Sequence, residues 1–150
     1  MTANRREFLQ GAAVSAALVL VSGTALHAEE NAEWQAWRDQ ILDGREASEG
    51  GIELDVPRVA ENGAQVPLTV RIDSPMTDAD HVRAIHIIAT RNPAPEIGSF
   101  HLSPQLARAE VFTRIRLAEE QEILVLAELS DGRVLGQAAI VTVSAGGCAT

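Results

Sequence analysis

Cys148 is the only cysteine of the chain and its most reactive side chain. Gly146 and Gly147 come immediately before it, and no large or charged residue follows it. Because glycine leaves the backbone unrestricted, we expect residues 144–150 to form a flexible arm with an exposed thiol. Fully extended, the four residues after Ser144 would carry the sulfur about 13–14 Å from the preceding strand. A thiol with this reach can enter a pocket of another protein.

A single thiol limits the chemistry of the chain. It cannot form an internal disulfide or a thiolate metal cluster. A catalytic cysteine needs a fixed general base, a helix N-terminus or a cation beside it, and a flexible arm supplies none of these. The pattern indicates a covalent attachment site at Cys148, with catalysis supplied by other proteins, as strongly as it indicates an incidental or disulfide-forming cysteine. An incidental tail cysteine and an intermolecular disulfide remain alternatives, and an enzyme with Cys148 as nucleophile is a third interpretation.

The other polar residues give weaker signals. His81, His86 and His101 lack the spacing of metal ligands, and in a regular strand His81 and His86 point to opposite faces. Such histidines are usually surface or hydrogen-bonded core residues, so we expect no metal and no cofactor. All 12 basic residues are arginine, which excludes lysine Schiff-base chemistry and a lysine-bearing phosphate loop. With 21 acidic residues the net charge is −9, which argues against nucleic-acid binding.

Apolar residues alternate with period two through most of the chain after Gly51, which is typical of half-buried strands. Seven short strands without a long helix between them predict an all-β fold, an immunoglobulin-like antiparallel β-sandwich. The segment 85–89 is apolar on both faces, so we expect it to be a central strand or a strand covered by another subunit. The predicted strands are residues 52–56, 66–72, 82–90, 97–102, 111–117, 123–129 and 133–143.

One amphipathic helix is expected ahead of the sandwich. Trp34, Trp37 and Ile41 recur at helical spacing and form its apolar stripe. Asn31 is the predicted N-cap, and Gly44 supplies the left-handed residue that ends helices. Such a helix either docks a partner or covers the core of its own domain, and the second is the more common arrangement in a small domain.

The first residues of the chain have the pattern of an export signal. Paired arginines, Arg5 and Arg6, precede an apolar run at residues 11–23. This order is typical of a twin-arginine signal peptide, which directs folded proteins to the bacterial periplasm. The run is rich in Ala, Gly and Ser and is too short for a membrane-spanning helix. We therefore predict a signal peptide at residues 1–28, followed by a soluble periplasmic domain at residues 29–143.

Several segments, in this order along the chain, resemble one known family. The most specific is Gly146-Gly147-Cys148, and the others are Ile52-Glu53-Leu54-Asp55-Val56-Pro57, Glu61-Asn62-Gly63-Ala64-Gln65-Val66-Pro67, Asn92-Pro93-Ala94-Pro95, Thr113-Arg114-Ile115-Arg116-Leu117 and Ser130-Asp131-Gly132. With the twin-arginine leader and the Trp-bearing helix, they resemble the SoxY family of periplasmic sulfur carriers over nearly the whole chain. Members typically end Gly-Gly-Cys-Gly-Gly, whereas here Ala149 and Thr150 follow the cysteine.

The resemblance implies an immunoglobulin-like subunit that forms a heterodimer with a second sandwich, a SoxZ-like subunit. It also implies that Cys148 is the site of covalent sulfur attachment and that Gly146 and Gly147 are the hinge of a swinging arm. A c-type cytochrome conjugating complex would load thiosulfate onto this cysteine, and a sulfate-releasing hydrolase and a sulfane dehydrogenase would process it. The chain itself would be a carrier and not an enzyme. The alternative is a non-covalent periplasmic binding or assembly module in which the cysteine is incidental.

Overall fold

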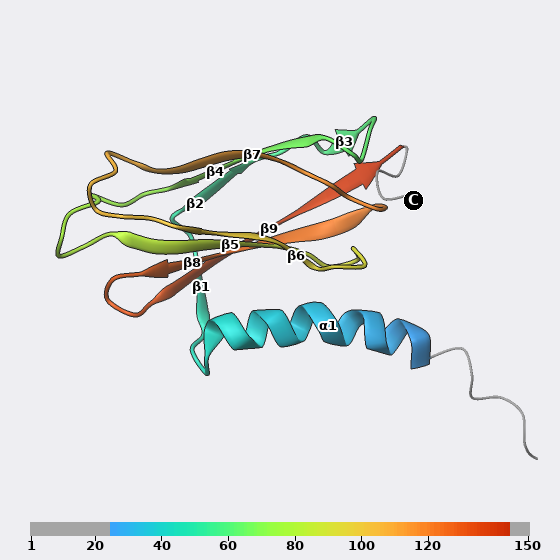
Figure 1. Cartoon of the computed structure of the whole chain (residues 1–150), viewed down its shortest axis with the longest axis horizontal. Helices are drawn as coiled ribbons and strands as arrows, with labels where there is room; N and C mark the ends of the chain where they lie inside the picture. The colour runs from blue at the N-terminus through green and yellow to red at the C-terminus, as the bar shows by residue number, and fades with distance from the viewer. Residues whose placement is uncertain (1–24, 145–150) are drawn as a thin grey trace, which may run out of the picture.

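The computed structural model describes residues 25–144, which form a sandwich of two β-sheets with one helix, α1 (Figure 1). The helix spans Ala25–Leu42 and lies along the outer face of the larger sheet. Nine strands follow the helix. They are β1 (Ala47–Glu49), β2 (Ile52–Asp55), β3 (Val59–Ala60), β4 (Val66–Ile72), β5 (Val82–Ala89), β6 (Glu96–His101), β7 (Ala109–Ile115), β8 (Gln121–Leu129) and β9 (Val134–Val143).

The two sheets differ in size and in strand direction. The larger has the order β1-β9-β8-β5-β6, with β3 also paired to β9, and the smaller has the order β2-β4-β7. All pairs are antiparallel except β1 with β9 and β3 with β9, which are parallel. The last strand, β9, therefore has β8 on one side and the two short strands on the other.

Side chains alternate between the core and the solvent along the strands, as a sandwich requires. In β7, Val111 and Ile115 are buried, whereas Phe112 between them is exposed. In β5, Ile85 and Ile87 face the core between the sheets and are fully buried. The side chains of the central strand β5 therefore form part of the apolar core that joins the two sheets.

The sequence predicted most of this architecture. The all-β sandwich is confirmed, and a strand is present at each of the seven predicted positions. The prediction of about seven strands is nevertheless too low, because β1 and β3 have only three and two residues and show no periodicity. Both pair in parallel with β9, so the prediction of a wholly antiparallel sandwich was wrong at this edge.

Helix α1 explains why β5 is apolar on both faces. Ile88 points away from the main core and forms a second, smaller cluster with Leu126 of β8 and Val134 of β9. Trp34 and Trp37 of the helix are half-buried against this cluster. The interpretation of the helix as a cover for its own domain, and of β5 as a central strand, is therefore confirmed.

The two ends of the helix differ in how well they were predicted. The helix ends at Leu42, and Asp43 and Gly44 have positive φ angles of 47° and 75°, as the glycine signal indicated. It begins at Ala25, so the prediction of Asn31 as N-cap was wrong. The preceding residues include Ala, Leu and Glu, which favour helix and extend it through this position. The predicted cleavage after residue 28 falls inside the helix.

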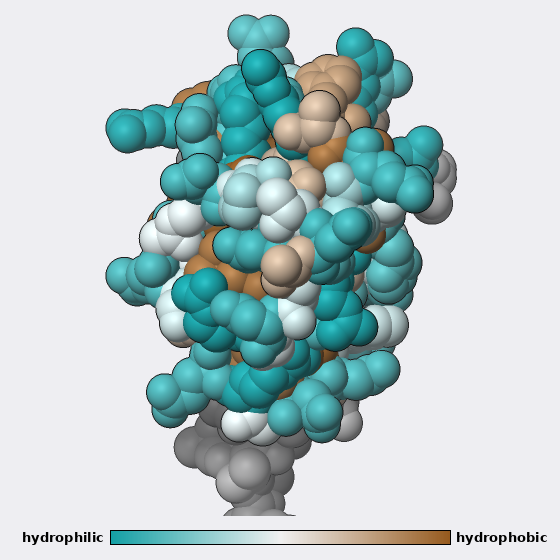
Figure 2. Space-filling view, turned by 90° about the vertical axis from the view of Figure 1, so that its left-hand side faces the viewer, coloured by the Kyte–Doolittle hydropathy of each residue, from teal (hydrophilic) through white to brown (hydrophobic). Residues whose placement is uncertain are grey.

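The surface at one end of the sandwich is mainly polar. The end of the sandwich that faces the viewer in Figure 2 is largely hydrophilic, with hydrophobic surface in small separate areas. Within residues 25–144 we find no helix that is both long enough and apolar enough to cross a membrane.

Candidate functional site

The predicted attachment site, Cys148, and the predicted hinge, Gly146 and Gly147, lie outside the described residues. The structure does describe the point from which they continue, because β9 ends at Val143 and Ser144 follows it. Cys148 is four residues beyond Ser144, so its Cα lies within about 13–14 Å of that residue at full extension. The surface around the end of β9 is therefore the part of the described domain that lies nearest to the predicted attachment site.

The end of β9 is held firmly in the sheet. Residues of β9 pair with β8 from Val134 to Val141, and Val141 is fully buried. Beyond this ladder, the backbone N–H of Thr142 donates to Arg58 O at 2.9 Å, and that of Ser144 donates to Ala60 O at 2.9 Å. The short strand β3 thus fixes the last residues of β9, and the following segment starts from a defined position.

His81, His86 and His101 lie far from this position. His86 is level with Leu126 and, through it, with Gly136 of β9, eight residues before Ser144. At about 3.3 Å per residue, this corresponds to a separation of about 26 Å along the strand. His81 and His101 lie still nearer the opposite end of the sheet. A thiol within about 14 Å of Ser144 therefore has none of these three histidines beside it as a general base.

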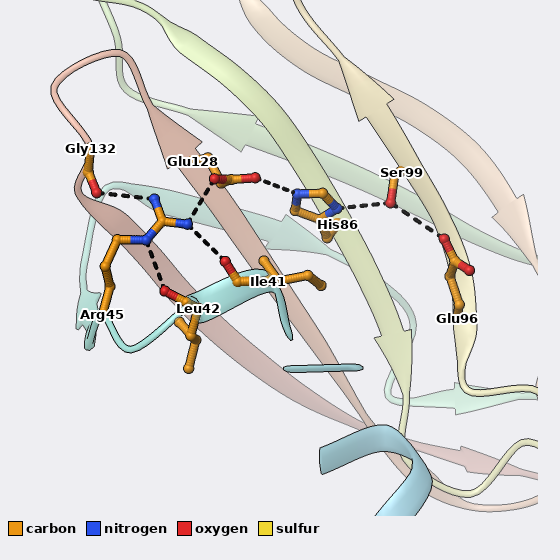
Figure 3. A network of polar contacts seen from close by, with 8 residues as sticks. All are labelled: Ile41, Leu42, Arg45, His86, Glu96, Ser99, Glu128 and Gly132. Carbon is orange, nitrogen blue, oxygen red and sulfur yellow. Dashed lines mark hydrogen bonds and ion pairs between the residues drawn. The ribbon is translucent and has the colours of Figure 1, made fainter. Parts of the chain in front are cut away.

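One polar network was not predicted from the sequence, and Figure 3 shows its members. Arg45, just after helix α1, donates to the carbonyl oxygens of Ile41 and Leu42 at 2.8 Å each and to that of Gly132 at 3.1 Å. Its Nη2 also pairs with Glu128 Oε2 at 2.9 Å. Arg45 therefore joins the C-terminal end of the helix to β8 and to the β8–β9 turn.

The network continues across the sheet from Glu128. Its Oε1 lies 3.0 Å from His86 Nε2, and His86 Nδ1 lies 2.8 Å from Ser99 Oγ on β6. The Ser99 hydroxyl donates in turn to Glu96 Oε1 at 3.5 Å. His86 is only 9% exposed and sits within the apolar run of β5. It is thus a hydrogen-bonded, buried residue, which is the role that the sequence favoured for such a histidine.

The environment of Glu128 lowers its pKa below the usual value. Partial burial on its own raises the pKa, because it disfavours the charged carboxylate. The hydrogen bonds with His86 and Arg45, together with the positive charge of Arg45, outweigh this effect. The carboxylate is therefore stabilised in its charged form, as an anchor for the helix needs. The sequence signal for this network was His86 in an otherwise apolar strand, but that signal did not identify Glu128 as its partner.

The network joins secondary-structure elements to each other, and its one hydroxyl, that of Ser99, lies beside His86 in the chain of contacts from β6 to β8. Among the described residues, no group of three or more His, Cys, Asp or Glu side chains is placed to hold a metal ion.

A different feature lies near the end of β9. A hollow of about 310 Å³ opens there between the helix and the sheet. It is lined by Trp34, Thr90, Arg91, Glu120, Gln121, Glu122 and Ile140.

The fold and the cysteine position define the class of this protein: a helix-covered β-sandwich whose last strand leads, four residues on, to a single thiol. The family of sulfur oxidation protein SoxY matches residues 38–148, so the match ends at the cysteine itself. The chain belongs to the SoxY family. No curated protein sequence matches the chain.

Solved structures agree with this assignment. The sulfur carrier protein SoxY from Chlorobium limicola f thiosulfatophilum has a TM-score of 0.62 and 26% sequence identity, covering 75% of this chain and 96% of that chain. A superoxide reductase (neelaredoxin) from Ignicoccus hospitalis has a TM-score of 0.56 and 13% identity, covering 63% of this chain and 80% of its own. A putative superoxide reductase from Thermotoga maritima has a TM-score of 0.54 and 18% identity, over 66% and 88% of the two chains. The two reductases show a shared fold alone.

Proposed function

We propose that this protein carries sulfur intermediates of thiosulfate oxidation as covalent adducts of the Cys148 thiol. The observation that carries the proposal is the family match, which extends through the sandwich to Cys148. The anchored end of β9 supports it, since it holds the start of residues 145–150 at a defined point on the domain. Gly146 and Gly147 would act as the hinge that lets one thiol reach several active sites.

The chemistry assigned to the thiol is attachment, with the electrons and the catalytic groups supplied elsewhere. In the loading step a bond forms between Cys148 Sγ and the outer sulfur of thiosulfate, two electrons pass to a c-type cytochrome complex, and the thiol proton is released. Hydrolysis of the terminal S–S bond by a partner enzyme then gives sulfate and leaves a persulfide on Cys148. The distance of His81, His86 and His101 from the end of β9 supports a thiol that depends on its partners for activation.

A covalent tether has a physical advantage for this chemistry. It keeps a reactive persulfide from diffusing away, and it raises the effective concentration of the substrate at each partner enzyme. We propose three such partners, namely the c-type cytochrome conjugating complex, a sulfate-releasing hydrolase and a sulfane dehydrogenase. We further propose that the chain forms a heterodimer with a SoxZ-like sandwich subunit, which co-purification and the mass of the complex in solution would establish.

We also propose that the protein works in the periplasm after export by the twin-arginine pathway. The supporting residues are Arg5, Arg6 and the apolar run that follows them. N-terminal sequencing of the periplasmic protein tests this proposal. A mature chain that starts close to residue 29 is the expected result, and retention of residues 1–28 would contradict it.

The deciding experiment is the intact mass of the protein isolated from the periplasm of cells grown on thiosulfate, measured before and after a reductant. We expect added masses of sulfur or thiosulfate that disappear on reduction. The matched control is Cys148→Ala, which should fold normally and show none of these adducts. An unmodified wild-type mass, or only a disulfide-linked dimer, would instead support a non-covalent binding or assembly module.

A further inference from the structure

An exposed apolar surface surrounds the end of β9, and we call it the tail-root patch: Val59, Ile140 and Thr142. Val59 of β3 is directly opposite Thr142 of β9, and Ile140 is two residues earlier on β9. Their neighbours Ala60 and Val141 point into the core and are buried, so the three patch residues share the outer face of the sheet. Val59 is 58% exposed and Ile140 is 66% exposed.

Acidic side chains border the tail-root patch. Glu122 of β8 is opposite Ile140 in the ladder, and Glu120 accepts a hydrogen bond from the Thr142 hydroxyl at 2.8 Å. Both glutamates and Ile140 also line the hollow of about 310 Å³ beside the helix. The one arginine that lines the hollow, Arg91, lies 3.8 Å from another carboxylate, that of Glu119. The surface thus combines an apolar centre, a depression and a border rich in carboxylates.

The backbone at this edge is also open to a partner. Strand β1 pairs with residues 134–136 of β9, and β3 pairs with residues 142–143. Within the described chain, no strand pairs with residues 137–141 on the same side of β9. An incoming chain can therefore approach an edge without a strand partner next to Ile140, as well as the apolar side chains.

The position of Cys148 determines what meets this surface. The Cα of Cys148 is at most about 14 Å from Ser144, which directly follows β9. A specific interface covers about 800 Å² on each protein, which is equivalent to a disc of about 16 Å radius. Thr142 and Ile140 are only two and four residues before Ser144, so a protein that binds the thiol close to the domain covers ground that includes the tail-root patch.

We propose that the tail-root patch is the docking surface for the enzymes that load and unload Cys148. It fits a partner that presents an apolar side chain to the patch and Arg or Lys side chains to Glu120 and Glu122. This inference rests on the proposed carrier function, and it adds the surface and the chemical character of the partner. Leu106, between β6 and β7, is an exposed apolar residue at the opposite end of the sandwich and serves as the control position.

The test uses the complete carrier, loaded with thiosulfate, and the purified sulfate-releasing hydrolase of the same system. We expect Ile140→Ser to lower kcat/KM for sulfate release about tenfold with little change in kcat, because an exposed contact contributes to association. Leu106→Ser should leave kcat/KM unchanged. The double variant Glu120→Gln, Glu122→Gln should reduce the dependence of kcat/KM on ionic strength, because it removes charges that attract a basic partner.

A binding measurement separates this inference from the carrier function. Titration of the hydrolase with a Cys148→Ser carrier needs no sulfur adduct, so it reports docking alone. We expect Ile140→Ser to weaken this binding about tenfold and Leu106→Ser to leave it unchanged. Equal affinity of the hydrolase for the Ile140→Ser and Leu106→Ser carriers would contradict the proposal that the tail-root patch is a docking surface, whatever the state of the thiol. If the intact mass of the isolated protein is unmodified but hydrolase binding still depends on Ile140, the carrier function is contradicted and the docking surface is supported.

Discussion

Replacement of Arg45 by methionine should release helix α1 from the sheet before the sandwich unfolds. The Arg45 side chain donates both to the last turn of the helix, at Ile41 and Leu42, and to the β8–β9 turn at Gly132. It also neutralises Glu128 at 2.9 Å. Methionine keeps most of the length of the side chain and removes all four interactions, so the variant reports on the polar contacts.

The size of the effect follows from these contacts. A hydrogen bond to a charged group contributes about 1.5–3 kcal/mol, and removal of one partner leaves the other group unsatisfied. The contacts share one side chain that is 33% exposed, so water replaces part of each and the contributions do not add in full. We therefore expect a loss of about 2–3 kcal/mol in the free energy of unfolding. For a domain of this size the midpoint of thermal unfolding should fall by about 5–10 °C.

Tryptophan fluorescence makes the assay specific for the helix. Both tryptophans of the protein, Trp34 and Trp37, lie on α1, whereas far-ultraviolet circular dichroism is dominated by the strands. In urea titrations of Arg45→Met, the fluorescence transition should precede the circular dichroism transition. Arg83→Met, at an exposed position on β5, is the control and should change stability by less than about 0.5 kcal/mol. Equal stabilities for the two variants, with coincident transitions, would refute the role of Arg45.

Other perturbations give separate tests of the fold and the tail. Glu128 has a lowered pKa in the folded protein, so it contributes stability above the ordinary pKa of 4.5 that is lost as the pH falls through the folded value. The stability difference between wild type and Glu128→Gln, from urea titrations at pH 6 and pH 3, should therefore shrink at pH 3, and a constant difference would contradict this. Ile87→Val and Ile88→Val should each cost about 1 kcal/mol in thermal unfolding, but only the second should shift tryptophan emission, because Ile88 packs under the helix. Deletion of Gly146 and Gly147 should shorten the reach of the thiol to about 7 Å. This deletion should lower the rate of sulfate release without changing the rate of alkylation by iodoacetamide. The control is replacement of both glycines by alanine, which keeps the length, and equal sulfate release from the two variants would show that reach does not limit transfer.

The success of the sequence analysis depended on how local each signal was. Alternation over seven or more residues identified β4 and β7, and a glycine identified the end of α1. The pairing of β3 with β9 joins residues more than 80 positions apart through two residue pairs, and no local pattern encodes it. The contact between Arg45 and Glu128 has the same origin, because it spans 83 positions and depends on how the helix crosses the sheet.

For the candidate site too, local features could be predicted from the sequence and long-range contacts could not. Cys148 was identified from its residue type and its two preceding glycines, which are local features. The tail-root patch was not identified, because only the parallel pairing of β3 with β9 brings Val59 to Thr142, two residues after Ile140. The register of β5 on β8 likewise decides which residues meet His86, and it includes an irregularity between Val82 and Ala84 that sequence periodicity does not reveal.

The arrangement of β9 links stability to the proposed carrier function. One end of the strand lies under the helix, where Val134 completes the second cluster, and the other end is fixed by β3 before the chain continues to Cys148. The titratable network lies at the first end, about 26 Å from Ser144 at 3.3 Å per residue. Protonation of Glu128 or loss of the helix contacts should thus alter stability without placing a new acid or base beside the thiol. The His86–Glu128 network therefore stays out of reach of the sulfur, and the proposed carrier function assigns activation of the thiol to a partner's active site.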